Sequence, residues 1–131
     1  MGGGFGHACS MIAERHPKLR FIVQDLPEIV AGGRCAISHT ANGNEAVISR
    51  ISFMKHDFLT PQTVAEADIF MFRFVIHDWP DRYVIQILLN IVPVLKANTR
   101  IIIMDYVIAR EGSVPKVVGR LERSVSITIL M

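Results

Sequence analysis

The chain has 131 residues, which is enough for one domain, and half of them are hydrophobic. The net charge of +2 and the lack of a lysine or arginine cluster argue against a nucleic-acid partner. No apolar run reaches the roughly 18 residues of a membrane-spanning helix. The two cysteines, Cys9 and Cys35, form neither a metal-spaced pair nor a disulfide framework, so a reducing cytoplasmic location is expected.

The chain opens on a glycine run, which contains Gly2, Gly3, Gly4 and Gly6. Glycines at this density let the backbone approach a ligand closely, and a helix that ends near Pro17 is predicted behind them. The alternative is a flexible linker, because a nucleotide-binding loop needs a strand before it and none precedes these glycines.

Leu19–Val23 is the first predicted strand, and Asp25 follows it about 20 residues beyond the glycines. An acidic residue at this spacing reaches ribose hydroxyls in dinucleotide-type folds. Asp25 is equally suited to cap a helix whose first position is Pro27. We expect that helix to be short and to stop at Gly32-Gly33.

Residues 34–49 show weak periodicity and are predicted to form a loop. The next predicted strand, Ile51–Lys55, leads into Asp57 and Phe58. An acid beside an aromatic ring at a strand end suits an adenine, by a hydrogen bond to its amino group and by contact with its ring. The alternative is a turn-forming acid and a core anchor. A helix is expected over 60–67.

Ile69–Phe72 is an unbroken apolar run, typical of a central strand that is buried on both faces. Chemistry in open α/β sheets lies beyond the carboxyl ends of the strands, where this run leads to Arg73 and His77. An imidazole there is a candidate general base. The alternative is that His77 packs beside Trp79 and helps to start the next helix.

Pro80–Lys96 is the clearest predicted helix, with last turns that Pro93 should bend or loosen and with a left-handed cap at Asn98. Arg100–Met104 is predicted to be a buried strand that ends in Asp105. Beyond it we expect a polar loop over 109–115 and a helix over 116–131. Strands that alternate with helices predict an α/β fold with a parallel sheet.

Four motifs in order carry a family resemblance: Gly-Gly-Gly-x-Gly, Phe-Ile-Val-Gln-Asp-Leu-Pro, Phe-Met-x-His-Asp-Phe and Arg-x-x-x-His-Asp-Trp-Pro-Asp. From Gly2 to about Leu121 the chain resembles the catalytic domain of S-adenosylmethionine-dependent O-methyltransferases. The likeness is to the plant caffeate/flavonoid type and its fungal secondary-metabolite relatives. It implies a Rossmann-like class I methyltransferase sheet, with residues 1–131 as a partial cofactor-binding domain. The first strand and the last two strands of that sheet are expected to be missing. The helical domain through which full-length relatives form homodimers is expected to be missing as well.

The residues that the resemblance assigns to S-adenosylmethionine are Gly2, Gly3, Gly4, Gly6, Asp25, Asp57, Phe58 and Arg73. Gly3 and Gly4 would line its methionine part, Asp25 would hold the ribose, and the Asp-Phe pair would hold the adenine. The resemblance makes His77 the base that deprotonates the acceptor and Asp105 the acid that orients the imidazole. The implied acceptor is a small hydroxylated aromatic molecule, and no metal is implied. A positioned base contributes roughly 10²- to 10⁴-fold to such a reaction.

Two other functions fit parts of the sequence. One is a non-catalytic remnant that serves as a binding or dimerisation module, and the truncated chain would then be inactive. The other is a fragment of a nicotinamide-dependent oxidoreductase, which accounts for the glycines and Asp25. That second alternative leaves the segment from Arg73 to Trp79 unexplained.

Overall fold

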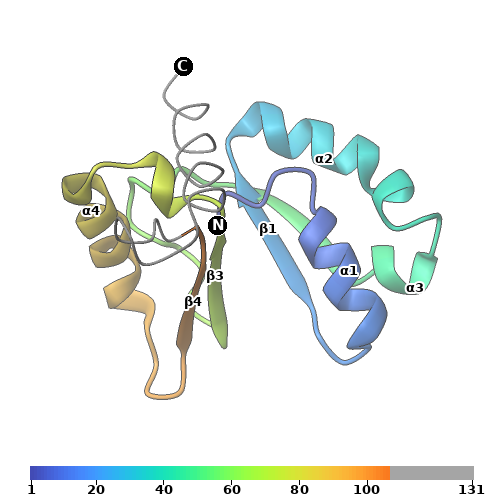
Figure 1. Cartoon of the computed structure of the whole chain (residues 1–131). Helices are drawn as coiled ribbons and strands as arrows, with labels where there is room; N and C mark the ends of the chain where they lie inside the picture. The colour runs from blue at the N-terminus through green and yellow to red at the C-terminus, as the bar shows by residue number, and fades with distance from the viewer. Residues whose placement is uncertain (107–131) are drawn as a thin grey trace, which may run out of the picture.

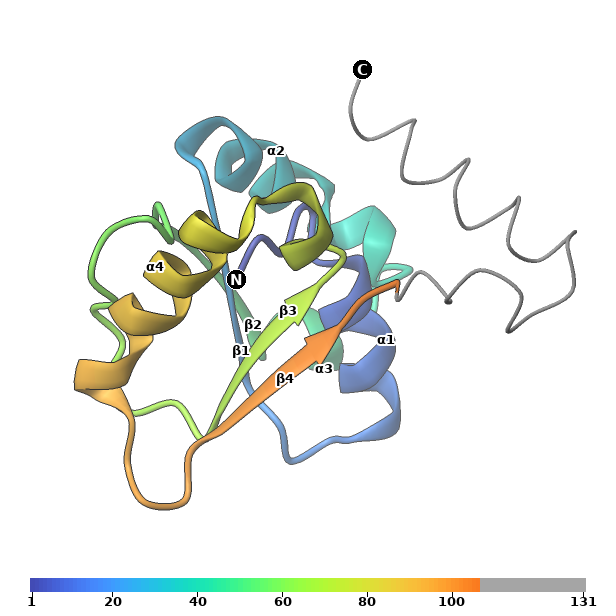
Figure 2. The ribbon, with the colours of Figure 1, turned by 60° about the vertical axis from the view of Figure 1, so that its left-hand side comes forward.

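A computed structural model describes residues 1–106 (Figures 1 and 2). The loop and helix predicted over 109–131 lie outside these residues. The elements are α1 (His7–Arg15), β1 (Phe21–Asp25), α2 (Pro27–Thr40), α3 (Glu45–Ile48), β2 (Ile51–Lys55), β3 (Ile69–Arg73), a 3-10 helix (Ile76–Asp78), α4 (Asp81–Ile91), a second 3-10 helix (Val92–Val94) and β4 (Arg100–Met104). Within this part of the chain no helix is long and apolar enough to cross a membrane.

The strands form two separate parallel pairs rather than one sheet. β1 pairs with β2, with Phe21 opposite Ile51, and β3 pairs with β4, with Ile69 opposite Arg100. Figure 1 shows the two pairs splaying apart, with α1, α2 and α3 beside β1 and with α4 on the far side of β3 and β4. The predicted α/β class with parallel strands is confirmed. The strands expected to be missing from the family's sheet stay a prediction.

Each strand pair has its own hydrophobic core. The core beside β1 and β2 includes Val23, Val30 and Phe53, and the core between β3 and α4 includes Phe72 and Ile87. Burial of such side chains stabilises each core by about 1.5–3 kcal/mol per residue. Each strand pair therefore packs against helices of its own.

Polar contacts join the two halves near the carboxyl ends of β1 and β3. The amino group of Met1 donates to the carbonyl of Met71 on β3 (3.0 Å), and the N–H of Gly3 donates to the carbonyl of Gln24 on β1 (3.1 Å). The buried amides of Gln24 and Gln62 donate to one another at 3.0 and 2.9 Å. The N–H of Gln62 also donates to a carbonyl of α4 (2.9 Å), so this pair connects β1 to the second core.

The helix expected to stop at Gly32-Gly33 instead runs to Thr40, so the loop predicted over 34–49 is wrong. Gly33 is buried inside α2, where a Cβ would lie 2.3 Å from the ring of Phe53. The glycine is therefore present for close packing of the helix on β2, and it does not end the helix.

The helix expected over 60–67 does not form. The side-chain carbonyl of Gln62 accepts the N–H groups of Thr63 and Val64, both at 2.9 Å. Because a side chain takes these donors, they are satisfied without a helical turn.

Two further expectations fail near the end of the described chain. Asn98 is not left-handed, since Asn42 and Phe74 are the non-glycine residues among 1–106 with positive φ. Every residue of β4 is exposed rather than buried, although side chains of successive residues point to both faces of the strand. The loosening expected at Pro93 is confirmed, since α4 ends at Ile91 and continues as a 3-10 helix.

Candidate functional site

The glycine loop and Asp25 meet at the carboxyl end of β1. The N–H of Gly4 donates to one carboxylate oxygen of Asp25, and the N–H of Leu26 donates to the other, both at 2.8 Å. Gly4 has φ +56, a conformation that favours glycine. A Cβ on Gly3 would lie 2.7 Å from a methyl group of Val23. The glycines therefore allow a tight loop, and the carboxylate of Asp25 holds that loop in place. The other lone pairs of the Asp25 oxygens can accept further hydrogen bonds.

Asp57 and Phe58 follow β2 and perform local structural roles. The carboxylate of Asp57 accepts the N–H of Leu59 (2.9 Å), which makes it the turn-forming acid. The ring of Phe58 packs edge-on against Trp79, with centroids 5.5 Å apart, and belongs to the second core. A Cβ on Gly2 would lie 3.7 Å from this ring, so Phe58 also borders the glycine loop. Asp57 and Phe58 thus act as the turn-forming acid and the core anchor, and their place beside the glycine loop also agrees with contact to an adenine.

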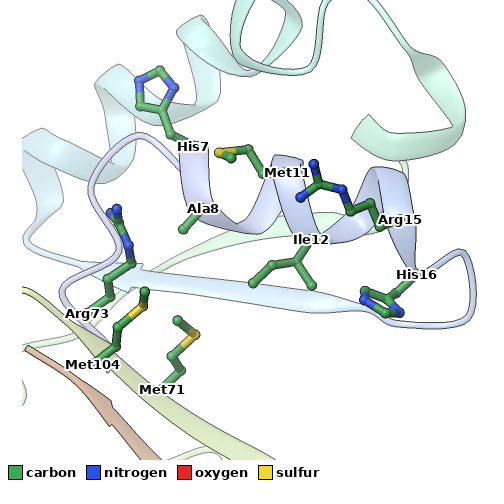
Figure 3. Close-up of a pocket in the computed structure, with 9 residues that line it drawn as sticks. All are labelled: His7, Ala8, Met11, Ile12, Arg15, His16, Met71, Arg73 and Met104. Carbon is green, nitrogen blue, oxygen red and sulfur yellow. The ribbon is translucent and has the colours of Figure 1, made fainter.

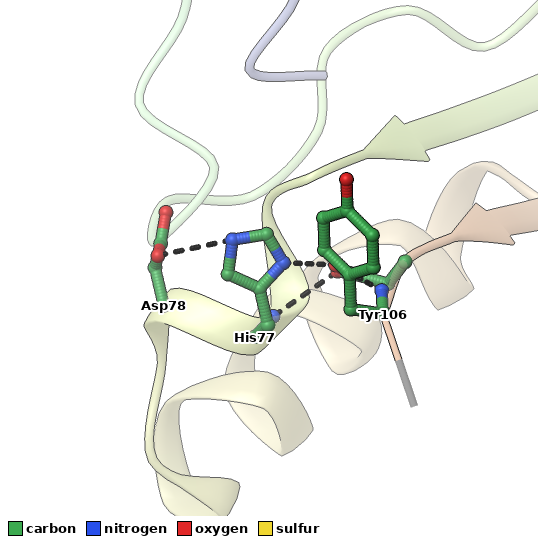
Figure 4. A network of polar contacts seen from close by, with 4 residues as sticks. His77, Asp78 and Tyr106 are labelled. Carbon is green, nitrogen blue, oxygen red and sulfur yellow. Dashed lines mark hydrogen bonds and ion pairs between the residues drawn. The ribbon is translucent and has the colours of Figure 1, made fainter. Parts of the chain in front are cut away.

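His77 lies in the short 3-10 helix after β3 and is held by Asp105 after β4 (Figure 4). Its ring Nδ1 forms a short hydrogen bond with one carboxylate oxygen of Asp105. Its backbone N–H donates to the other oxygen (3.1 Å), and the N–H of Tyr106 also donates to this carboxylate (3.0 Å). The pairing predicted for His77 and Asp105 is therefore present in the structure.

The electrostatics of Asp105 favour its ionised form. Burial by itself raises the pKa of Asp105. The hydrogen bonds from the His77 ring, from the backbone N–H of His77 and from Tyr106, together with the charge of His77, outweigh burial and hold that pKa below its ordinary value. An ionised Asp105 selects the ring tautomer whose proton is on Nδ1. That tautomer leaves Nε2 as the basic nitrogen.

A second carboxylate flanks the imidazole. Nε2 of His77 lies 3.2 Å from a carboxylate oxygen of Asp78, so each ring nitrogen faces an acid (Figure 4). Asp78 has no role predicted from the sequence, although its place next to His77 is a visible signal. The imidazole therefore lies between two carboxylates.

Aromatic side chains complete the surroundings of His77. The ring of Phe74 stacks on Tyr106, with centroids 5.0 Å apart and planes at 12°, and the guanidinium of Arg73 lies 4.3 Å from the centre of the Phe74 ring. Sequence reasoning missed both aromatic residues. Phe74 directly follows β3, and Tyr106 follows β4, so the two rings meet because β4 pairs with β3.

A cavity lies between α1 and the β3–β4 pair, and neither His77 nor Asp105 lines it. It has a volume of about 330 Å³ and is drawn in Figure 3. Its lining residues are His7, Ala8, Met11, Ile12, Arg15, His16, Met71, Arg73 and Met104. Of the predicted site residues only Arg73 reaches it, so the structure does not bring all of them into one cavity. Among residues 1–106 no group of three or more histidines, cysteines or acidic side chains is arranged to hold a metal ion.

Comparison with known proteins identifies the family. The sequence model of the O-methyltransferase domain matches residues 1–130. The O-methyltransferase pgmB of Aspergillus terreus (strain NIH 2624 / FGSC A1156) is 40% identical over 131 residues, a match that covers 99% of this chain and 36% of pgmB. The chain thus spans about a third of that relative, and only 13% of the length of another curated match.

Solved structures agree with this assignment. One is titled "The structure of LepI complex with SAM" and another "A Pericyclic Reaction enzyme". Each has a TM-score of 0.80 and 34% identity to this chain, and the match covers 99% of this chain and 30% of the other. Because the family model spans nearly all residues and the fold agrees, the chain belongs to the O-methyltransferase domain family.

Proposed function

We propose that this chain supplies the cofactor site and the general base of an S-adenosylmethionine-dependent O-methyltransferase that acts on a small hydroxylated, phenolic molecule. The observation that carries the proposal is the imidazole of His77. Asp105 holds its Nδ1, so Nε2, which lies 3.2 Å from Asp78, is the nitrogen that can accept a proton. A phenol with a pKa near 10 needs such a base at neutral pH.

The glycine loop supports S-adenosylmethionine as the cofactor. Its backbone lies so close to Val23 that a side chain at Gly3 would not fit, and Asp25 holds it through Gly4. We expect this cradle to bind the methionine part while Asp25 accepts from the ribose hydroxyls. Asp57 and Phe58 would border the adenine, and Arg73 would lie beside the cofactor. When bound, S-adenosylmethionine supplies an electrophilic methyl group.

The chain's own residues then handle a single proton. Nε2 of His77 accepts it from the acceptor hydroxyl as the oxygen becomes nucleophilic. The charge that develops on the ring is stabilised by Asp105 and Asp78, which face its two nitrogens. The alignment of acceptor and methyl group provides the remaining acceleration through proximity.

One matching structure is titled for a different reaction, since it is called "A Pericyclic Reaction enzyme". A match to this fold therefore does not by itself establish methyl transfer. The carboxylate-held imidazole of His77 is what favours methyl transfer here.

A chimaera tests the proposal, because the chain covers about a third of pgmB. Residues 1–131 replace the matching segment of pgmB, and transfer of isotope-labelled methyl from S-adenosylmethionine to the pgmB acceptor is measured. We expect transfer above background and protection against thermal unfolding by S-adenosylmethionine but not by NAD. Protection by NAD alone would support the oxidoreductase alternative. Cofactor binding without transfer would support a non-catalytic module.

A further inference from the structure

Two buried glutamines, Gln24 and Gln62, form a reciprocal amide pair that the proposed chemistry does not use. Each side chain donates an N–H to the side-chain carbonyl of the other, at 3.0 and 2.9 Å, and the two residues are only 4% and 5% exposed. The side-chain carbonyl of Gln62 also accepts the N–H groups of Thr63 and Val64. Because only an oxygen can accept these donors, the orientation of the Gln62 amide is fixed, and the orientation of the Gln24 amide follows from it.

One end of this amide pair leads to the glycine loop. The backbone carbonyl of Gln24 accepts the N–H of Gly3 (3.1 Å), and Gln24 directly precedes Asp25 at the end of β1. The carboxylate of Asp25 in turn accepts the N–H of Gly4 (2.8 Å). A shift of Gln24 would therefore move the groups that we propose to hold the methionine and ribose parts of the cofactor.

The other end leads to Phe58, which we propose to border the adenine. The backbone N–H of Gln62 donates to the carbonyl of Asn90 on α4 (2.9 Å), and the side-chain amide of Asn90 donates to the carbonyl of Phe58 (3.1 Å). Phe58 packs against the core between β3 and α4, whereas Gln24 lies on β1 in the other strand pair. The hydrogen bonds of the amide pair thus run from one strand pair to the core of the other.

This link matters because the two strand pairs do not share a sheet. Among residues 1–106 no ladder of backbone hydrogen bonds joins β1 to β3, so side chains contribute to their relative placement. A buried amide pair suits this purpose, since a displacement that breaks it leaves two buried polar groups without partners.

We propose that Gln24 and Gln62 are positioning residues for S-adenosylmethionine, because they set the separation between the glycine loop and Phe58. The inference rests on the proposed function, from which it takes the contacts of the cofactor. A ligand that reaches both the loop and Phe58 depends on this separation. Adenine alone, which would contact the Phe58 side, does not depend on it.

The test compares the affinities of these two ligands in the pgmB chimaera, by calorimetry for S-adenosylmethionine and by ligand-observed NMR for adenine. Gln24→Met and Gln62→Met keep the length of the side chain but leave the partner amide unpaired. Each should raise the S-adenosylmethionine Kd about threefold to tenfold and leave the adenine Kd within about twofold. The double variant should raise the S-adenosylmethionine Kd no more than the larger single change, because the two side chains share one contact. Gln86→Met, at an exposed glutamine on α4, is the matched control and should leave both Kd values unchanged.

The inference would be overturned by an unaltered S-adenosylmethionine Kd in both single variants at a temperature where circular dichroism shows them folded, since the glutamines would then serve stability alone. An equal rise in the adenine Kd, or no binding of adenine to the unaltered chimaera, would overturn it as well. A rise in the double variant that equals the product of the single rises would show that the glutamines act separately. Absence of S-adenosylmethionine binding by the unaltered chimaera is a different result, because it refutes the proposed function and the inference with it.

Discussion

The imidazole of His77 is flanked by carboxylates at both nitrogens, which makes its removal the sharpest test at the scale of single residues. In the pgmB chimaera, His77→Ala should lower methyl transfer by about 10²- to 10⁴-fold, because the acceptor then lacks a positioned base. Cofactor affinity should stay nearly constant. The control is His39→Ala, an exposed histidine on α2. Unchanged transfer by His77→Ala across a pH series would refute the assignment.

Asp25 is expected to serve the cofactor both directly and through the loop. Asp25→Ala removes the acceptor for the Gly4 N–H as well as the charged acceptor proposed for the ribose. Loss of hydrogen bonds to a charged group costs about 1.5–3 kcal/mol, so the S-adenosylmethionine Kd should rise about tenfold to hundredfold. Calorimetry on the chimaera measures this, with Asp81→Ala in the exposed first turn of α4 as the control. An unaltered Kd would remove Asp25 from the site.

His56 predicts a pH dependence of stability. Burial lowers the pKa of His56, although nearby Asp57 opposes the shift, and Nε2 is buried without a hydrogen-bond partner among residues 1–106. The folded state therefore favours the neutral ring. The neutral His56 ring contributes fully to stability above the pKa of His56 in the unfolded chain, which is near 6.5. That contribution is lost as the pH falls through the lower pKa that His56 has in the folded chain.

Urea unfolding between neutral and mildly acidic pH measures this dependence. His56→Gln should flatten the fall in the free energy of unfolding, and His39→Gln should not, because His39 is exposed. The window of Asp105 lies at lower pH, since the pKa of that carboxyl is held below its ordinary value of 3.8. An equal slope in His56→Gln and the unaltered chain would show that another group titrates.

At the scale of elements, α2 contains two adjacent glycines with different surroundings. A Cβ on Gly33 would lie 2.3 Å from the ring of Phe53, which is buried, so Gly33→Ala should destabilise by about 1–3 kcal/mol through overpacking. A Cβ on Gly32 would meet the far end of Phe5, which is 42% exposed and free to move.

Gly32→Ala should therefore be neutral or should stabilise by up to about 1 kcal/mol, because alanine favours a helix interior over glycine. Chemical denaturation of both variants measures the contrast. A larger loss of stability in Gly32→Ala than in Gly33→Ala would contradict the packing seen between α2 and β2.

Sequence patterns predicted the elements whose signals are local. Apolar runs identified β2, β3 and β4, and helical spacing identified α4, whose last turns loosen at Pro93. Motif order brought out His77 and Asp105, which the structure joins. These successes share one cause, since each depends on residues within a few positions of one another or on the shared edge of parallel strands.

The errors come from contacts between distant residues. A helix end is predicted at Gly33 because its packing on Phe53, 20 positions later, has no local signature. The helix predicted after Thr60 does not form because the side chain of Gln62 accepts backbone N–H groups, which no sequence pattern signals. Tyr106 was missed because its role depends on the pairing of β3 with β4.

At the scale of the whole molecule, two strand pairs face each other without forming one sheet. The backbone of Met1 and Gly3 donates hydrogen bonds to β3 and β1, respectively. Among residues 1–106, however, no strand pairs with the edges of β1 and β3 that face each other. Ile22 on β1 and Ile69 on β3 are each 48% exposed. Unpaired edges with exposed apolar side chains recruit strands of other molecules. The glycine loop is bonded to both strand pairs, so its conformation depends on how β1 and β3 are placed relative to each other.

We therefore expect the isolated chain to self-associate through these edges and to bind S-adenosylmethionine more weakly than the chimaera does. Light scattering across a concentration series measures the first effect, and calorimetry measures the second. Ile22→Lys should reduce association, because a charge on an edge strand opposes pairing. Leu89→Lys is the control, since Leu89 is 61% exposed on α4, away from these edges. A monomeric chain with micromolar cofactor affinity would show that the two strand pairs aim the glycine loop without a further strand between them.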